Sequence, residues 1–74
     1  MENETLRQYL DRIGIKSGDD SGFVLQHGGT EMQVSRRYLE SEPWRYLLDK
    51  PIIDYIYPYV NMYGQKTIKL FVER

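Results

Sequence analysis

The segment of residues 52–71 constrains the fold of this chain more than any other. It is rich in β-branched and aromatic residues, holds four of the seven tyrosines, and is interrupted by a turn-like segment from Asn61 to Gly64. Residues of these types favour strands. A helical alternative exists, because apolar residues also recur at helical spacing at Ile52, Ile56, Val60 and Tyr63. Pro58 counts against it, since an interior proline costs a helix about 3 kcal/mol. We therefore expect two strands joined by a tight turn.

The turn between these strands predicts their register. Asn61 in the first position and Gly64 in the last fit a type I turn in which the glycine takes the left-handed conformation. The expected pairs are then Tyr59 with Thr67, Tyr57 with Lys69, Tyr55 with Phe71, Pro58 with Ile68, Ile56 with Leu70 and Asp54 with Val72. One face of this hairpin becomes aliphatic, with Ile56, Val60, Ile68, Leu70 and Val72. The opposite face becomes aromatic, with Tyr55, Tyr57, Tyr59 and Phe71.

Pro58 also indicates where this hairpin lies in a sheet. Proline has no N–H group to donate to a neighbouring strand, so its strand is expected at an edge or with an irregularity at that position. Helices can cover only one face of the hairpin. We expect them on the aliphatic face.

Another hairpin is predicted around Gly28-Gly29. Both glycines accept positive φ at low cost, and the flanking residues 23–27 and 30–34 have strand-like composition. Pairing across the turn places Leu25 opposite Met32 and Phe23 opposite Val34. These four apolar side chains share one face, and the other face holds Val24, Gln26, Glu31 and Gln33.

An amphipathic helix is predicted from Asn3 to Ile13. Its apolar residues follow the i, i+3, i+4, i+7 spacing of one helix face. Asn3 is the expected N-cap, and Gly14 is the expected left-handed residue just after the helix, followed by Ile15 in the position that completes a Schellman motif.

Residues 35–48 predict two short helices or one kinked helix. Ser35 is a good N-cap, and the residue before Pro43 is disfavoured from helical conformation. The expected inner face consists of Tyr38, Leu39, Trp44, Leu47 and Leu48. The basic residues Arg36, Arg37 and Arg45 are expected to form a solvated face, partly neutralised by Glu40 and Glu42.

The order of predicted elements is α-β-β-α-α-β-β, which defines an α+β fold. The simplest assembly is a small antiparallel sheet of two β-hairpins, with the N-terminal helix and one or two short central helices on its aliphatic face. A chain of 74 residues allows one domain, residues 1–74. With no cysteine and one histidine, neither a disulfide nor a structural zinc site is expected to add stability. Stability is expected to come from packing or self-association.

No pattern in the sequence is typical of catalysis, cofactor binding or metal binding. Asp19 and Asp20 lack the alternating ligand positions of a calcium loop, so we interpret them as part of a solvated connector. His27 has no serine or cysteine nucleophile nearby. We therefore predict a non-enzymatic protein without cofactor or metal.

The leading functional hypothesis is a protein-binding module of the adaptor or regulatory type, with self-association as a homodimer or other homo-oligomer included. A contiguous aromatic patch on a small domain is typical of an interface. The expected partner-binding residues are Tyr55, Tyr57, Tyr59, Phe71, Lys69, Arg36 and Arg37. If the N-terminal helix covers the aromatic face, these tyrosines belong to the core instead.

The alternative hypothesis is single-stranded nucleic-acid binding. The same aromatics would stack on bases, while Lys66, Lys69, Arg36 and Arg37 would follow the phosphates. A formal net charge of −1 and the lack of an RNP-like motif count against it.

The first residues predict a cytoplasmic, soluble protein without a membrane partner. They are acidic and lack the basic region and apolar run of a secretory signal. No run of about 18 apolar residues is present that would span a bilayer.

Overall fold

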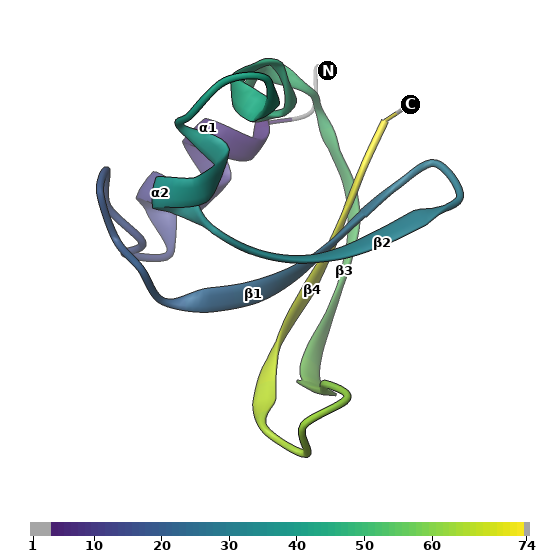
Figure 1. Cartoon of the computed structure of the whole chain (residues 1–74). Coiled ribbons are helices and arrows are strands. Elements are labelled where there is room, and N and C mark those ends of the chain that lie inside the picture. The colour runs from purple at the N-terminus through teal and green to yellow at the C-terminus, as the bar shows by residue number, and fades with distance from the viewer. Residues whose placement is uncertain (1–3, 74) are drawn as a thin grey trace.

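The protein has an α+β fold built on one four-stranded sheet (Figure 1). The computed structural model describes residues 4–73. Its elements, in chain order, are α1 (Leu6–Arg12), β1 (Gly22–His27), β2 (Thr30–Ser35), α2 (Arg36–Leu39), the 3₁₀ helix η1 (Trp44–Asp49), β3 (Ile52–Val60) and β4 (Lys66–Val72). The order confirms the predicted α-β-β-α-α-β-β arrangement, with the second central helix in 3₁₀ form. In Figure 1 the helices lie together, and the tip of the β3–β4 hairpin projects away from them.

The sheet is mixed and not purely antiparallel as the sequence predicted. Its strand order is β2-β1-β4-β3, and the two central strands β1 and β4 run parallel. The physical reason lies in β1, where Phe23, Val24 and Leu25 are all buried. A strand with consecutive buried residues needs cover on both faces and a neighbour on both sides, which suits a central position.

Helix α1 is capped at both ends by sequence-local contacts. Thr5 is the N-cap and forms a capping box with Gln8. The predicted cap, Asn3, lies outside the described residues. At the other end, Gly14 has φ 94° and the Ile15 amide donates to the Leu10 carbonyl at 2.9 Å, which confirms the predicted Schellman motif.

Both hairpin turns lie at the predicted residues, although of the Gly28-Gly29 pair only Gly28 has a positive φ, of 61°. Across Gly28-Gly29, Leu25 pairs with Met32 and Phe23 with Val34, as expected. In the second turn the Gly64 amide donates to the Asn61 carbonyl at 3.0 Å, and Gly64 has φ 78°. The left-handed glycine therefore closes the β3–β4 hairpin as predicted.

The region after β2 forms two short helices, one on each side of Pro43. Ser35 caps α2, because its hydroxyl accepts from the Tyr38 amide at 3.1 Å. Trp44 begins η1, packs against the core and stacks on the Tyr38 ring, with ring centroids 5.8 Å apart. Trp44 therefore packs on the core side, as predicted, and is partly buried there. The prediction that Tyr38 belongs to the same inner face is wrong, because Tyr38 is exposed.

The core lies between the helices and one face of the sheet. Its buried members come from every element except β3: Leu6, Tyr9, Leu10, Phe23, Leu25, Val34, Leu39, Leu47, Leu48, Leu70 and Val72. Ile52 at the start of β3 packs against this cluster without being fully buried.

Arg36 is buried, which corrects its prediction as part of a solvated helix face. Only 5% of the residue is exposed. Its guanidinium pairs with Asp11, donates to the Ile15 carbonyl at 2.9 Å, and contacts Glu40 at 3.3 Å. Asp11 lies in α1, Ile15 follows it, and Glu40 is the C-cap of α2. Arg36 therefore links the two helices, and its charge is compensated by these acceptors.

We expect Arg36→Gln to lower the free energy of unfolding by about 2–3 kcal/mol, because it removes the charged donor of a nearly buried network. The neighbouring Arg37 provides a matched control. It is exposed and contacts Asp20 at 3.3 Å, so Arg37→Gln should change stability by less than about 0.5 kcal/mol. Urea denaturation of both variants measures the difference. Equal losses would contradict the structural role of Arg36.

Glu40 makes the fold sensitive to acid. The Ser17 hydroxyl donates to its carboxylate at 2.7 Å and the Gly18 amide at 2.9 Å. The Ser17 hydrogen bond is the main cause that holds the pKa of Glu40 below its ordinary value of 4.5, with Gly18 and Arg36 adding to it. Because the pKa of Glu40 is lower in the folded than in the unfolded protein, its ionised carboxylate stabilises the fold at pH values above the unfolded pKa. This stabilisation is lost as the pH falls through the folded pKa.

We therefore expect the stability to fall as pH drops below about 5. Glu40→Gln should flatten this dependence because glutamine does not titrate, although its single side-chain oxygen replaces only one of the two oxygens that accept from Ser17 and Gly18. Ser17→Ala should also reduce the slope, since it removes the largest cause. Urea midpoints measured from pH 3 to pH 7 give the profiles. Identical slopes in the wild type and Glu40→Gln would argue against this role of Glu40.

Candidate functional site

The most unusual surface of the protein is strand β3. It lies at the edge of the sheet, and among the described residues no strand pairs with its outer side. Seven of its nine residues are exposed, although they are mostly large and apolar. The exposed apolar side chains are Ile53, Tyr55, Ile56, Tyr57 and Val60. Soluble proteins usually protect such an edge with charges, bulges or covering segments.

The unpaired part of this edge has defined ends. At its start, the Ile52 amide donates to the Glu4 carbonyl at 2.8 Å, and Thr5 forms an isolated bridge with Pro51. At its far end, Pro58 has no N–H group to offer. Between these ends lie residues 53–57, whose outer side pairs with no strand among the described residues. Within this segment the Tyr55 amide donates to the Asp54 carboxylate at 2.8 Å. We call these five residues the β3 edge.

The two predicted faces of the β3–β4 hairpin are partly wrong. The register near the turn is as expected, with Tyr59 opposite Thr67. Shifts occur between Ile56 and Tyr59 and again between Ile52 and Asp54, so Tyr55 lies opposite Leu70 and not Phe71. The irregularity at Pro58 that the sequence predicted is the cause. One extra β3 residue there moves the next side chains to the other face.

Ile56 and Asp54 therefore leave the side on which the sequence placed them. Ile56 lies opposite Lys69 and Asp54 opposite Phe71, and both are exposed. Ile68, Leu70 and Val72 face the core as predicted, whereas Val60 is exposed near the turn. The four expected aromatic residues do not form one face.

Tyr55 turns toward α1. Its ring lies 6.2 Å from the Tyr9 ring, and the Arg12 guanidinium lies 4.9 Å from the centroid of Tyr9. Arg12 also pairs with Glu4 at 2.8 Å, and this hydrogen bond holds the pKa of Glu4 below its ordinary value of 4.5. Burial, together with the neighbouring Tyr55, raises the pKa of the Tyr9 hydroxyl. Helix α1 thus covers part of one expected interface residue, and Tyr55 remains 56% exposed.

Tyr59 and Phe71 lie on the face of the sheet away from the helices, which we call the open face. The Lys69 ammonium sits between them, 5.2 Å from each ring centroid, and pairs with Glu31 at 2.6 Å. This cluster covers Val24 of β1, which pairs with Lys69 of β4 and is only 1% exposed. The cluster therefore forms a small second layer that covers the open face of β1.

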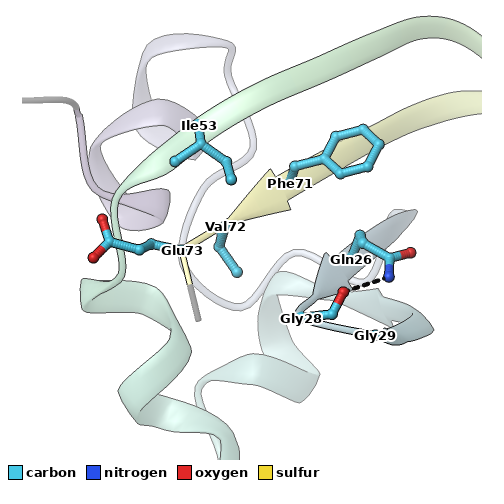
Figure 2. Close-up of a pocket in the computed structure, with 7 residues that line it drawn as sticks. All are labelled: Gln26, Gly28, Gly29, Ile53, Phe71, Val72 and Glu73. Carbon is cyan, nitrogen blue, oxygen red and sulfur yellow. Dashed lines mark hydrogen bonds between the residues drawn. The ribbon is translucent and has the colours of Figure 1, made fainter.

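A hollow of about 580 Å³ adjoins the β3 edge (Figure 2). Ile53 and Phe71 supply its apolar wall from β3 and β4, while Gln26 and the Gly28-Gly29 turn supply the wall on the β1 side. Val72 and Glu73 complete the lining. The Gln26 amide donates to the Gly28 carbonyl at 2.7 Å, as the dashed line in Figure 2 shows. The volume is in the range of pockets that accept a large side chain or a small ligand.

The basic residues expected at a binding site are engaged within the fold. Arg36 is buried, Arg37 pairs with Asp20, and Lys69 pairs with Glu31. The structure does not bring these three together with Tyr57, which is 70% exposed near the irregularity of β3. Sequence reasoning singled out Tyr57 but missed Ile53 as part of an exposed site. Ile53 lies at the register shift between Ile52 and Asp54, and the sequence there has no glycine or other residue that would predict such a shift.

The remaining polar candidates have no catalytic arrangement among residues 4–73. His27 lies edge-on to the Tyr46 ring, with centroids 6.2 Å apart, and its Nε2 atom is buried without a hydrogen-bond partner. Asp19 caps its own loop by accepting from the Ser21 amide at 2.7 Å, and this bond lowers the pKa of Asp19. In the same residues no group of three or more potential ligands is placed to hold a metal ion. None of their helices has the length and apolarity to cross a membrane.

Comparison with protein-family models, with curated proteins and with solved structures finds no match to this chain. Its function has to be inferred from its own surface.

We expect Lys69→Glu to lower the free energy of unfolding by about 1–2 kcal/mol, because it replaces the Glu31 ion pair and two ring contacts by like-charge repulsion. Lys66→Glu on the same strand is the control, since Lys66 is exposed near the turn and should change stability by less than about 0.5 kcal/mol. Thermal or urea unfolding compares them. A Lys69→Glu variant as stable as the control would show that the Lys69 cluster contributes nothing to the fold.

Proposed function

We propose that the protein is a small protein-binding module that accepts a partner strand along the β3 edge. The observation that carries this proposal is the exposed strand itself. Among the described residues no strand pairs with the outer side of residues 53–57, the Tyr55 amide there donates only to the Asp54 side chain, and every side chain except Asp54 is aliphatic or aromatic. An extended segment that lies beside such a strand gains main-chain hydrogen bonds, and its alternate side chains pack on the neighbouring residues.

The composition of the β3 edge supports a protein partner. Asp54 is its only charged residue, and the others are Ile53, Tyr55, Ile56 and Tyr57. Tyrosine offers a large ring with few rotatable bonds, so fixing it at an interface costs little conformational entropy. The adjoining hollow gives one incoming side chain a place to insert, which is how strand-addition sites obtain specificity.

The contacts of the basic residues favour a protein partner over single-stranded nucleic acid. Three of the four cations that would follow phosphates, Arg36, Arg37 and Lys69, are engaged by carboxylates. The Lys69 ammonium also occupies the space between Tyr59 and Phe71. A base stacking on either ring would therefore displace this ammonium, which raises the free-energy cost of such binding.

Selection of a random-peptide display library against the purified protein tests the proposal. We expect the selected peptides to bind as extended strands, to shift the backbone amide resonances of residues 53–57, and to slow hydrogen exchange of the outward amides there. Tyr57→Ser should weaken their binding about tenfold, the effect of one interface residue worth roughly 1.4 kcal/mol.

Tyr63→Ser is the matched control, because Tyr63 is as exposed as Tyr57, at 72% against 70%, but lies in the β3–β4 turn. The Tyr63→Ser variant should bind the same peptides with the affinity of the wild type. Selected peptides that map away from the β3 edge, or that bind Tyr57→Ser and wild type equally well, would refute the proposed function.

A further inference from the structure

We infer that the partner of the β3 edge is a second copy of this chain, joined by antiparallel pairing of β3 with β3 so that two four-stranded sheets become one eight-stranded sheet. The inference rests on the proposed function, because it identifies the strand that the edge accepts. The copy is related by a two-fold axis that passes beside Tyr55.

The limits of the β3 edge determine this register. Antiparallel pairing of residues 53–57 with themselves places Ile53 opposite the copy's Tyr57, Asp54 opposite the copy's Ile56, and Tyr55 opposite its equivalent. A shift in either direction would set part of the edge opposite Ile52, whose amide already donates to Glu4, or opposite Pro58, which has no N–H. The centred register is therefore the one that sets residues 53–57 of each copy opposite one another alone. In it the Tyr55 amide exchanges its hydrogen bond to the Asp54 side chain for one to the backbone of the copy.

The charge distribution is compatible with self-pairing. Asp54 is the only ionised side chain on the β3 edge, and in the centred register it faces an isoleucine of the other copy. The two Asp54 carboxylates are offset by two residues, on the order of 7 Å along the strands. Like charges directly opposite each other would destabilise a strand pair, and this register avoids them.

In the dimer the hollow accepts Tyr57, the most exposed tyrosine of β3. Residues directly opposite in an antiparallel pair point to the same face. Tyr57 of one copy lies beside Ile53 of the other, and Ile53 lines the 580 Å³ hollow. The ring then packs on Ile53 and Phe71, while the side-chain oxygen of Gln26 offers an acceptor for its hydroxyl. Two such insertions occur, one on each side of the axis.

The area available predicts a weak dimer. An aromatic side chain offers about 150–250 Å² of surface, and Tyr55 and Tyr57 are 56% and 70% exposed. With the two isoleucines, the edge contributes on the order of 400 Å² per copy, or about 800 Å² in total, which is half of a standard interface of about 1,600 Å². We therefore expect a dissociation constant of roughly 10–100 µM.

Sedimentation equilibrium of the full chain over a dilution series from 1 µM to 1 mM tests the inference, with circular dichroism to verify that each variant is folded. We expect a monomer–dimer equilibrium in the wild type, weakened about tenfold by Tyr57→Ser and unaffected by Tyr63→Ser. Ile56→Asp should also weaken it, because it places a second carboxylate opposite Asp54 of the copy. Adding Asp54→Lys to Ile56→Asp should restore the dimer, since each lysine then faces an aspartate.

Each outcome is decisive. A wild type that is monomeric up to 1 mM overturns the inference, and peptides that nevertheless bind residues 53–57 would leave the proposed function standing. A dimer insensitive to Tyr57→Ser and Ile56→Asp also overturns it, because another surface would then be responsible. A dimer weakened by Ile56→Asp but not restored by the charge-swapped double variant overturns the register. Restoration in the double variant, with no effect of Tyr63→Ser, supports both the partner and the register.

Discussion

The parallel pairing of β1 with β4 is the contact on which the rest of the structure depends. It joins two hairpins, each short enough to be marginal alone, into one sheet with a single core. Because β1 and β4 take the central positions, β2 and β3 become the edges. Strand β2 continues directly into α2. Among residues 4–73, the Glu4–Thr5 segment lies beside the start of β3 and no strand pairs with the rest of its outer side, so this exposed edge follows from the way the hairpins are joined.

The sequence predicted what local contacts determine. The Schellman motif at Gly14, both hairpin turns and the break before Pro43 follow from residues within about six positions of one another, and all are present. The β1–β4 pairing could not be derived in this way, because it joins segments about 45 residues apart. Its one signal is the consecutive apolar run from Phe23 to Leu25, which a two-stranded hairpin with one buried face does not require.

The errors at the candidate site have the same origin. An irregularity at Pro58 was predicted, but the local sequence does not indicate that it adds one residue to β3 and so moves Tyr55 to the side of α1 and the Tyr9 ring. The burial of Arg36 depends on Asp11 and the Ile15 carbonyl, contributed by a distant segment. The fold engages at least six basic residues in ion pairs. Four of the exposed large apolar side chains lie together on the β3 edge, beside the hollow that we propose Tyr57 of a second copy fills.

The central claim is that the outward amides of residues 53–57 pair with no described strand in the monomer, where the Tyr55 amide donates to the Asp54 side chain, and that they pair with a second strand on association. Residue-resolved hydrogen exchange measured at low and at high protein concentration tests it most directly. In dilute protein, alternate amides of this segment should exchange quickly while those directed toward β4 exchange slowly, and the fast set should become protected as the concentration rises. Amides that are all slow in dilute protein, or a fast set that stays fast when a dimer forms, would contradict the account.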